Sequence, residues 1–534
     1  MTAVIDVIIV GAGHNGMISA ALLAKAGHSV LVLERRDAVG GMALTREFEP
    51  GFQAPTLTHA IGPLAPEVTR ALKRLRFDRG GLQFITPDPA LTSLGRDGRV
   101  ISFHRDPVFT AESINRMEPN SKDAGRWREF KDTTQKLALV FRDLNRHPAP
   151  DIDDPTRGDL WRLLNTGRRA RALGKKNLSR LIRYMPMAVA DLVSEWFDND
   201  LVRATIASRA IFGHFAGPWS AGTGGLLMQR MADDPMPFGS GITVAGGPGA
   251  LSRAIQTVAE TAGVKIRTNT AVARIRTAGG AATGVILDDG EEIAGRIVLS
   301  ALDPKTTLQQ LVDPADLPPV FAGRVRNIRA RGVTAKVNLA LSERPVFDAL
   351  HGDEIALRGR LLIANGIDDL ERAFDAAKYG EIPEQPWLEI SVPTVVDGSL
   401  APEGRHVMSI VAHTIPHTVR DETIDEHDVF YKNVMRVLAR HAPGLESLIV
   451  GREIIMPADI ERDWGAAGGH IYHGEQTLDQ WWAMRPLLGW ADGSSPISGL
   501  FLTGAGTHGG GGVTGMPGFH AARRVGDAIK ALRR

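Results

Sequence analysis

Residues 4–16 read VIDVIIVGAGHNG, and this stretch decides the fold. Its first seven residues are mostly β-branched and apolar, which predicts a strand buried on both faces of a parallel sheet. A G-x-G-x-x-G pattern follows at Gly11, Gly13 and Gly16, directly before an Ala- and Leu-rich segment, residues 17–26, that predicts a helix. This order of strand, glycines and helix predicts the first half of a dinucleotide-binding unit.

Each glycine of the pattern has a physical task. Gly11 permits a tight turn, Gly13 lets the backbone approach a pyrophosphate, and Gly16 allows close packing of the helix on the strand. The start of the helix supplies unpaired N–H groups and partial positive charge for the phosphates. We therefore predict cofactor contacts at Gly11, Gly13, Asn15 and Gly16.

A second strand, residues 29–33, ends at Glu34, whose carboxylate can accept hydrogen bonds from ribose hydroxyls. The continuation, residues 34–43, resembles the extended fingerprint of the glutathione-reductase-like FAD superfamily, in which a Gly-Gly pair passes close to the cofactor. A simple turn is the alternative for that pair. The predicted FAD contacts in this segment are Glu34, Arg35, Gly40, Gly41 and Met42.

Near the other end of the chain, residues 497–503 read ISGLFLT and predict another short strand. A glycine-rich run, residues 504–518, and a helical segment, residues 519–532, follow. Such a run is expected where main chain passes against a flat ring and directs N–H groups at it, with a flexible linker as the alternative. A linker rarely separates a buried strand from an amphipathic helix. We expect cofactor contacts at Gly504, Ala505, Gly506, Gly515 and Met516.

The two terminal runs, residues 11–43 and 499–523, resemble the phytoene desaturase and carotenoid oxidoreductase family of FAD enzymes. Within it the chain looks closest to the branch that holds the FAD-type β-carotene ketolases and the group called pyridine nucleotide-disulfide oxidoreductase domain-containing protein 2. Interior segments extend the resemblance over nearly the whole chain, at residues 195–198, 246–251, 393–397, 469–473 and 478–480.

The resemblance implies an α/β fold with a glutathione-reductase-like, FAD-binding Rossmann domain. This domain is discontinuous and is expected to comprise residues 1–71, 240–306 and 487–534. An inserted α+β substrate domain then comprises residues 72–239 and 307–486. In related FAD proteins the segment that matches Val272 lies beside the adenine, with core packing as the alternative. Residues 246–249 open a helix but lack a distal acid, so we predict one dinucleotide site.

The resemblance also implies an FAD-dependent oxidoreductase that oxidises a carbon–carbon bond of an apolar, isoprenoid-like or cyclic small molecule by hydride transfer to flavin N5. Two alternatives stay open: ketolase-type oxygenation beside a ring, and a non-catalytic FAD-fold protein that binds a prenyl chain or a protein partner. Oxygen or a quinone is the expected electron acceptor, because a second nucleotide unit is missing.

His508 follows the family's Thr-His pattern and is the candidate catalytic residue, able to orient the ring or to shuttle a proton. Gly509 stands where the family usually has proline, which puts the local backbone in question. His473 matches a family histidine and His470 does not. For both, a hydrogen-bonded core or surface residue is an equally good interpretation.

Composition excludes several classes of function. The 62 Lys+Arg residues nearly balance the 61 Asp+Glu residues, so the overall charge gives no reason to expect nucleic acid. The chain has no cysteine, which excludes disulfide bonds, thiolate metal sites and dithiol redox chemistry. No metal-ligand cluster is legible, so no metal is predicted. The length of 534 residues predicts more than one domain.

Residues 7–24 lack charged side chains, but glycines interrupt them, so we predict no transmembrane helix. We predict no signal peptide either, because Asp6 stands in place of a basic region and the first strand begins almost immediately. A cytoplasmic protein is expected, with peripheral membrane contact open and the oligomeric state undetermined. Residues 157–183 hold nine Lys and Arg residues against Asp159 alone. This run predicts either a basic amphipathic surface on anionic lipid or a solvated helical face, and the glycines within it favour the second.

Overall fold

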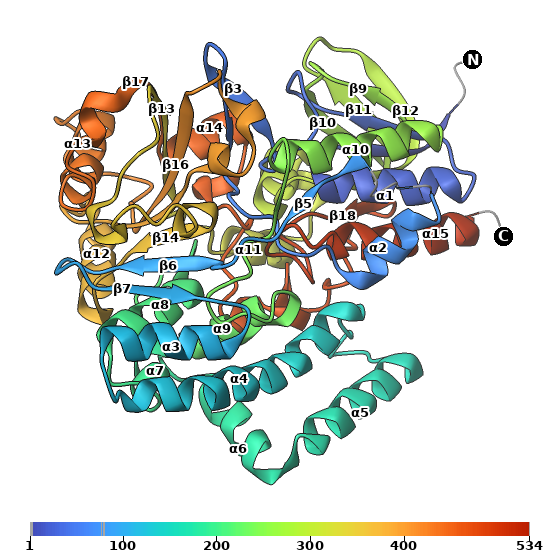
Figure 1. Cartoon of the computed structure of the whole chain (residues 1–534). Coiled ribbons are helices and arrows are strands. Elements are labelled where there is room, and N and C mark those ends of the chain that lie inside the picture. Colours follow the sequence, from blue (N-terminus) through green and yellow to red (C-terminus); the bar gives the residue numbers. More distant parts are fainter. Residues whose placement is uncertain (1–3, 76, 78–80, 533–534) are drawn as a thin grey trace.

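Two seven-stranded sheets organise the computed structural model, which describes residues 4–75, 77 and 81–532 (Figure 1). The first sheet has the order β10-β11-β12-β1-β2-β9, with β18 paired to β12, and the second has the order β17-β13-β16-β15-β14-β6-β7. The helices α1, α2, α10 and α15 lie at the first sheet, and a layer of helices from α3 to α9 lies along the lower part of the molecule in Figure 1.

The first sheet joins strands from three separate parts of the chain. Its strands are β1 (Ile5–Val10), β2 (Val30–Leu33), β9 (Lys265–Arg267), β10 (Val272–Ala278), β11 (Ala281–Leu287), β12 (Glu292–Ser300) and β18 (Leu500–Leu502). Strands β9, β2, β1, β12 and β18 pair in parallel, whereas β10 and β11 are antiparallel. Within the described chain, these strands come from residues 5–33, 265–300 and 500–502.

Strand β1 is buried on both faces, as its unbroken apolar sequence predicts. Val7 and Ile9 pack in a core with α1 (His14–Lys25), α10 (Pro248–Thr261) and α15 (Met516–Leu532). Ile8 and Val10 point to the opposite core, which α11 (Pro319–Arg326) covers. Helix α1 begins three residues earlier than predicted, because Gly13 already serves as its N-cap.

The second sheet is mixed and belongs to the predicted insertions. Its strands are β6 (Leu91–Leu94), β7 (Val100–Phe103), β13 (Ala335–Leu341), β14 (Arg360–Ile363), β15 (Trp387–Ser391), β16 (His406–His413) and β17 (Ile449–Ile455). One parallel pairing, between β6 and β14, joins the two insertions into one sheet. Helix α13 (Glu426–Leu438) packs on one face of this sheet.

Helices of the first insertion form an aromatic-rich core around Trp127 and Phe197. They are α3 (Pro107–Met117), α4 (Lys122–Arg146), α5 (Arg157–Ala172), α6 (Gly174–Tyr184), α7 (Val189–Ser194), α8 (Asp200–Ile211) and α9 (Thr223–Asp233). Residues 188–211 have the composition of one helix but form two, because α7 ends at Ser194. The side chain of Asn199 accepts the N–H groups of Leu201 and Val202 and so starts α8 as its N-cap.

Helices α5 and α6 form a hairpin at the lower edge of the molecule in Figure 1. Gly158 and Gly167 lie inside α5, and only Gly174, with φ +80°, lies at a helix boundary. The expectation that the glycines would break up this run is therefore wrong for two of the three. The reason is that glycine lowers helix stability by only about 1 kcal/mol and does not block the helical backbone.

The remaining elements connect these layers. They are β3 (Thr45–Glu49), β4 (Phe52–Pro55), α2 (Pro66–Lys73), β5 (Phe84–Ile85), β8 (Thr243–Val244), α12 (Ile367–Lys378) and α14 (Pro457–Trp464). Across the described residues, every helix is too short or too polar to span a lipid bilayer. The uncharged stretch at residues 7–24 is divided between β1 and α1.

Candidate functional site

A cavity of about 450 Å³ lies where β1, β2 and the glycine-rich C-terminal run meet the second sheet and helices α8 and α9. Both ends of the chain line it, together with residues from the middle. The sequence-predicted residues that the structure brings together on its wall are Gly11, Gly13, Asn15, Gly16, Glu34, Arg35, Gly40, Gly41, Met42, Val272, Gly504 and Ala505.

The glycine loop after β1 leaves open space at one position and close contact at the others. A Cβ atom on Gly16 would lie 2.5 Å from the carbonyl oxygen of Gly11, and one on Gly41 would lie 3.2 Å from Cα of Gly13. A Cβ atom on Gly13 would have no neighbour within 4 Å. Gly13 therefore presents bare backbone at the start of α1, which is the geometry that close approach of a pyrophosphate requires.

Glu34 is fixed at the end of β2 by backbone donors. Its Oε2 atom accepts the N–H of Ala12 at 2.8 Å, and its Oε1 atom accepts the N–H of Arg36 at 3.0 Å. The side chain is only 7% exposed and lines the cavity. These bonds hold the carboxylate in one orientation, and its predicted contact with ribose hydroxyls stays a prediction.

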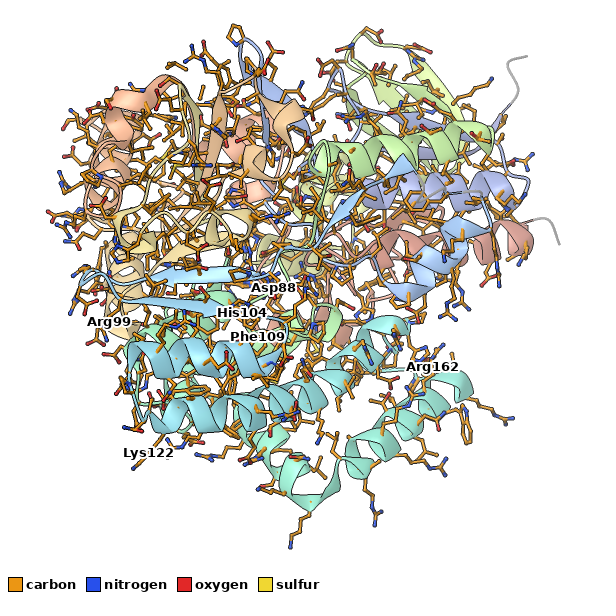
Figure 2. The ribbon with its side chains drawn as sticks, in the orientation of Figure 1. Asp88, Arg99, His104, Phe109, Lys122 and Arg162 are labelled. Atoms are coloured by element: carbon orange, nitrogen blue, oxygen red, sulfur yellow. The ribbon has the colours of Figure 1, made fainter. Side chains whose placement is uncertain are left out.

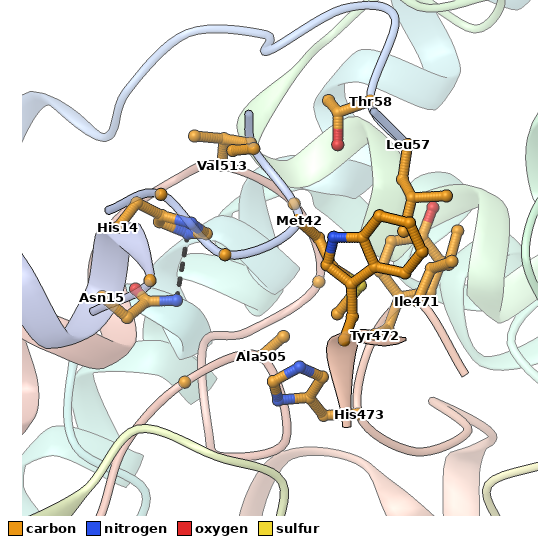
Figure 3. Close-up of a pocket in the computed structure, with 18 of the residues that line it drawn as sticks. His14, Asn15, Met42, Leu57, Thr58, Ile471, Tyr472, His473, Ala505 and Val513 are labelled. Atoms are coloured by element: carbon orange, nitrogen blue, oxygen red, sulfur yellow. Dashed lines mark hydrogen bonds between the residues drawn. The ribbon is translucent and has the colours of Figure 1, made fainter. Parts of the chain in front are cut away.

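Arg35 and Met42 connect the cavity to helix α14. The Nη2 atom of Arg35 donates to the carbonyl oxygen of Asp463 at 2.6 Å, and Met42 packs in an apolar cluster with Leu57 and Trp464. Arg35 thus anchors the rim to α14, while Met42 lies inside the opening with Leu57 and Val513 (Figure 3).

Three residues of the C-terminal run pack against the body instead of lining the cavity. A Cβ atom on Gly506 would overlap Pro304, and one on Gly515 would lie 2.6 Å from Ile18. Met516 is 1% exposed and begins α15 three residues earlier than predicted. These residues set the backbone path, and the wall itself is formed by their neighbours Gly511, Gly512, Val513 and Thr514, which sequence reasoning did not select.

The two ends of the chain are bonded directly behind this wall. The hydroxyl of Ser19 donates to the carbonyl oxygen of Gly518 at 2.9 Å, across 499 positions of sequence. The amide oxygen of Asn15 accepts the N–H of Gly518 at 3.3 Å. The starts of α1 and α15 therefore converge beside the same cavity, which concentrates positive helix-end potential there.

His508 lies outside the group of cavity residues. It is 3% exposed, and its Nε2 atom lies 3.2 and 2.9 Å from the carbonyl oxygens of Leu144 and His147. Burial lowers the pKa of His508 to about 4, although the bonds to the two carbonyls oppose this shift. The neutral ring ties the glycine-rich run to the end of α4, so this geometry does not support the predicted catalytic role.

His473 is better placed than His508. It lines the cavity beside Ala505, and Figure 3 shows the two near the opening opposite His14 and Asn15. Burial lowers the pKa of His473 against the opposing charge of Asp303, and its Nδ1 atom has no hydrogen-bond partner in the described chain.

His14 also lines the cavity. Its ring contacts Asn15 at 3.0 Å, and burial lowers the pKa of His14 to about 4. His14 lies inside the G-x-G-x-x-G motif, and this position in the sequence could have identified it as a cavity residue.

The far part of the cavity is polar and comes from α8, α9, β14 and β15. Arg209 pairs with Asp234 at 3.4 Å, and Arg360 pairs with Glu389 at 2.7 Å. Other residues of this part are Thr205, Ser208, Phe212, Gln229, Arg230 and Phe238. None carries a local motif, because tertiary pairing alone brings them together. In the described parts of the chain, no three His, Asp or Glu side chains are grouped to hold a metal ion.

Comparison with known proteins places these features in context. The sequence profile of the family described as flavin containing amine oxidoreductase matches residues 16–529. The rat protein named pyridine nucleotide-disulfide oxidoreductase domain-containing protein 2 is 31% identical, over 97% of this chain and 93% of its own. The zeta-carotene-forming phytoene desaturase of Myxococcus xanthus is 27% identical, over 96% of this chain and 91% of its own.

A solved structure has the same fold. A putrescine oxidase variant with a redesigned cofactor site superposes with a TM-score of 0.61 at 18% identity, and the alignment covers 99% of both chains. At this identity the likeness concerns the fold and not the substrate.

Proposed function

Because the chain belongs to the flavin containing amine oxidoreductase family, whose cofactor is FAD, we propose that it oxidises a carbon–carbon bond of an isoprenoid-like or cyclic small molecule. The observation that carries the proposal is the single cavity in which the β1–α1 glycine loop and the glycine-rich C-terminal run meet. Both the predicted α/β FAD-binding fold and the predicted cofactor are confirmed by the family and its structural neighbours.

The residues present fit an FAD molecule. The bare backbone at Gly13 and the start of α1 would hold the pyrophosphate, and the fixed carboxylate of Glu34 would accept the ribose hydroxyls. Val272 lines the same cavity, where the adenine contact was expected. When bound, FAD supplies the hydride acceptor.

The residues beyond the glycine loops would bind and orient the substrate. Leu57, Ile471 and Tyr472 line the cavity near Ala505 and His473 (Figure 3), and Phe212 and Phe238 line it farther in. Such a wall excludes water from an apolar substrate carbon and restricts its position over the ring. The relative from Myxococcus xanthus, which is named for the desaturation of phytoene, supports carbon–carbon oxidation as the reaction type.

Oxygen or a quinone is the proposed electron acceptor. Residues 246–249, the other glycine-rich helix start, have no open backbone for a second nucleotide, since a Cβ atom on Gly249 would lie 2.6 Å from the backbone nitrogen of Thr45. The hydroxyl of Thr45 also accepts the N–H of Gly249 at 3.0 Å. This helix start is therefore used for packing, which favours an acceptor that does not need a nucleotide loop.

An anaerobic substrate screen tests the reaction. Carotenes, retinoids and cyclic monoterpenes are mixed with the flavin-loaded protein, and the flavin absorption band is followed. Bleaching by one class, with a product that has lost a hydrogen pair, is the expected result. A product that instead gains labelled oxygen in air would replace desaturation with ketolase-type oxygenation. A folded but colourless preparation that cannot be loaded with FAD would contradict the proposal and leave a non-catalytic binding protein.

We also propose that the α5–α6 hairpin rests on an anionic membrane surface, where an apolar substrate would dissolve. Leu160, Trp161, Leu164 and Ile182 are 54%, 59%, 48% and 66% exposed on it. Figure 2 shows side chains extending from both helices, with Arg162 labelled on α5. Four basic residues of the hairpin form ion pairs with carboxylates, namely Arg162, Arg169, Arg180 and Arg183. Among the described residues, the other five basic side chains form none, which leaves positive charge for anionic lipid.

Vesicle sedimentation tests this contact. We expect the protein to pellet with vesicles of phosphatidylcholine and phosphatidylglycerol at low salt, and far less with phosphatidylcholine alone. Replacing Leu160, Trp161 and Leu164 with serine should lower partitioning about tenfold, because that apolar area no longer enters the interface. The control replaces three exposed apolar residues outside the hairpin, Val320, Val346 and Val450, with serine; they are 72%, 65% and 53% exposed. Equal losses in the two triple variants would contradict the assignment to the hairpin.

A further inference from the structure

Arg230, in the part of the cavity away from the glycine loops, lacks the acidic partner that Arg209 and Arg360 have there. Arg209 and Arg360 are paired with Asp234 and Glu389. For Arg230, no carboxylate lies within ion-pair distance in the described part of the chain. Buried charges are normally paired, because removing a charge from water without compensation is costly. An unpaired guanidinium on a cavity wall therefore needs an explanation.

Neutral groups hold Arg230 in place. Its Nη1 atom donates to the carbonyl oxygen of Gly511 at 3.1 Å, and Nη2 donates to that of Phe212 at 3.1 Å. The guanidinium carbon lies 3.9 Å from the centre of the Tyr472 ring. These contacts hold the guanidinium group of Arg230 between the glycine-rich C-terminal run and the end of α8 without neutralising the charge of that group. Part of the side chain stays exposed to the cavity.

The surroundings add positive charge. Arg485, 2% exposed, donates to the carbonyl oxygens of Glu475, Tyr472 and Ala505, and the nearby charge of Arg230 helps burial to lower the pKa of Arg485 to about 9. His214 lies 3.1 Å from Arg230, and burial keeps the pKa of His214 well below its usual range, so the ring is neutral. The cavity region at Arg230 therefore has net positive potential.

The nearest acids in the sequence do not offset this charge. Asp234 is held by Arg209 and accepts the N–H of Ser240 at 2.8 Å. Asp233 also lines the cavity, where burial raises its pKa to about 6, and the cations acting on it are Arg142 and Arg146 of α4. Neither aspartate lies within ion-pair distance of Arg230.

Two other side chains of the same wall carry polar atoms without a hydrogen-bond partner in the described chain, although the amide nitrogen of Gln229 donates to the carbonyl oxygen of Gln476 at 3.2 Å. The Oε1 atom of Gln229, a residue 9% exposed, has none, and neither ring nitrogen of His59, 8% exposed, has a hydrogen-bond partner in the described chain. Buried polar atoms are usually satisfied, so unsatisfied ones on a cavity wall indicate that a polar ligand completes them. A purely hydrocarbon substrate would leave them and Arg230 uncompensated.

We propose that the substrate is a carboxylic acid, isoprenoid-like or cyclic, whose carboxylate pairs with Arg230. This inference rests on the proposed function, since it assigns the substrate class of the same cavity. A guanidinium binds a carboxylate through two parallel hydrogen bonds, and the low dielectric of an enclosed site strengthens the pair. The apolar residues Leu57 and Ile471 contact the hydrocarbon part, so the anionic end fixes which carbon–carbon bond lies over the flavin.

Binding titrations on the flavin-loaded protein test this pair. The probes are cyclohexanecarboxylate and geranate, compared with the corresponding amides, and the readout is the perturbation of the flavin spectrum. We expect the carboxylates to bind at least tenfold more tightly than the amides. Arg230→Met should remove this preference, and Arg230→Lys should retain part of it. The matched control is Arg452→Met, since Arg452 stacks on Tyr431 at 4.1 Å outside the cavity.

Equal affinity of the native protein for acids and amides would overturn the proposal. The proposal would also be overturned if Arg230→Met keeps the preference for acids over amides and instead lowers the reduction potential of the flavin. Arg230 would then stabilise the reduced cofactor and not bind the substrate. If Arg230→Met fails to retain flavin, the ratio of affinities for acid and amide is compared between the native protein and Arg230→Lys. An unchanged ratio in Arg230→Lys would overturn the proposal, and a reduced ratio would support it. An acid preference without flavin reduction by any compound would refute the proposed reaction and leave the anion site intact.

Discussion

Gly13→Trp is expected to yield a folded protein that contains no flavin. Gly13 is the one glycine of the loop after β1 whose Cβ position is open, and that open space lies on the cavity wall where the pyrophosphate would lie. An indole attached at this open Cβ position would take space on the cavity wall that the cofactor needs, so the fold should survive while the cofactor is excluded. The ratio of flavin to protein absorbance measures the loss, and circular dichroism reports the fold.

Gly125→Trp is the matched control for this variant. Gly125 lies on the exposed surface of α4, and a Cβ atom there would also have no neighbour within 4 Å. The same substitution at that position should leave the flavin content unchanged. Full flavin content in Gly13→Trp would show that the cofactor does not pass over this loop. The thermal midpoint of the flavin-free variant should also fall, because bound cofactor stabilises only the folded state.

Acid is expected to destabilise the protein steeply below about pH 6.5, the ordinary pKa of histidine. Burial lowers the pKa of His508 to about 4 and the pKa of His413 to about 3, and the two side chains are 3% and 1% exposed. The unfolded chain takes up these protons near the ordinary pKa, whereas the folded chain does not. The free energy of unfolding therefore has its full value above that pH. As the pH falls toward the folded-state pKa, each of the two histidines lowers this free energy by about 1.4 kcal/mol per pH unit.

The thermal midpoint measured between about pH 7.5 and about pH 4.5 tests this expectation. His508→Asn and His413→Asn should each flatten the decline, because each removes one group that takes up a proton on unfolding. His351, exposed to solvent, is the control for the same substitution, and His351→Asn should leave the slope unchanged. A slope that is the same in all three variants would show that other groups control the acid response.

Much of the cofactor half of the fold follows from short stretches of sequence. Strand β1, helix α1 and strand β2 are neighbours in the chain, so the apolar run, the glycine spacing and Glu34 describe one local unit. The errors there are small: α1 begins at His14, because the glycine loop is short enough to serve as its cap. Where local packing dominates, the sequence pattern and the structure agree.

The substrate half could not be predicted in the same way. Arg209, Arg230, Arg360 and Glu389 meet only because α8, α9, β14 and β15 converge, and no spacing pattern in the sequence records that convergence. His508 was selected from a family motif, yet its ring bonds to carbonyl oxygens at the end of α4. Motifs identified the segments near the cavity, but they did not determine which side chains face it.

The bond between Ser19 and Gly518 has a consequence for the order of events during synthesis. During synthesis β1 and α1 emerge long before β18 and α15, so one wall of the cavity is missing until the later segment is available. Folding of the first strands and completion of the cofactor site are thereby separated in time, since long-range closure must await that later segment. Flavin capture is then expected only after α15 has docked on α1.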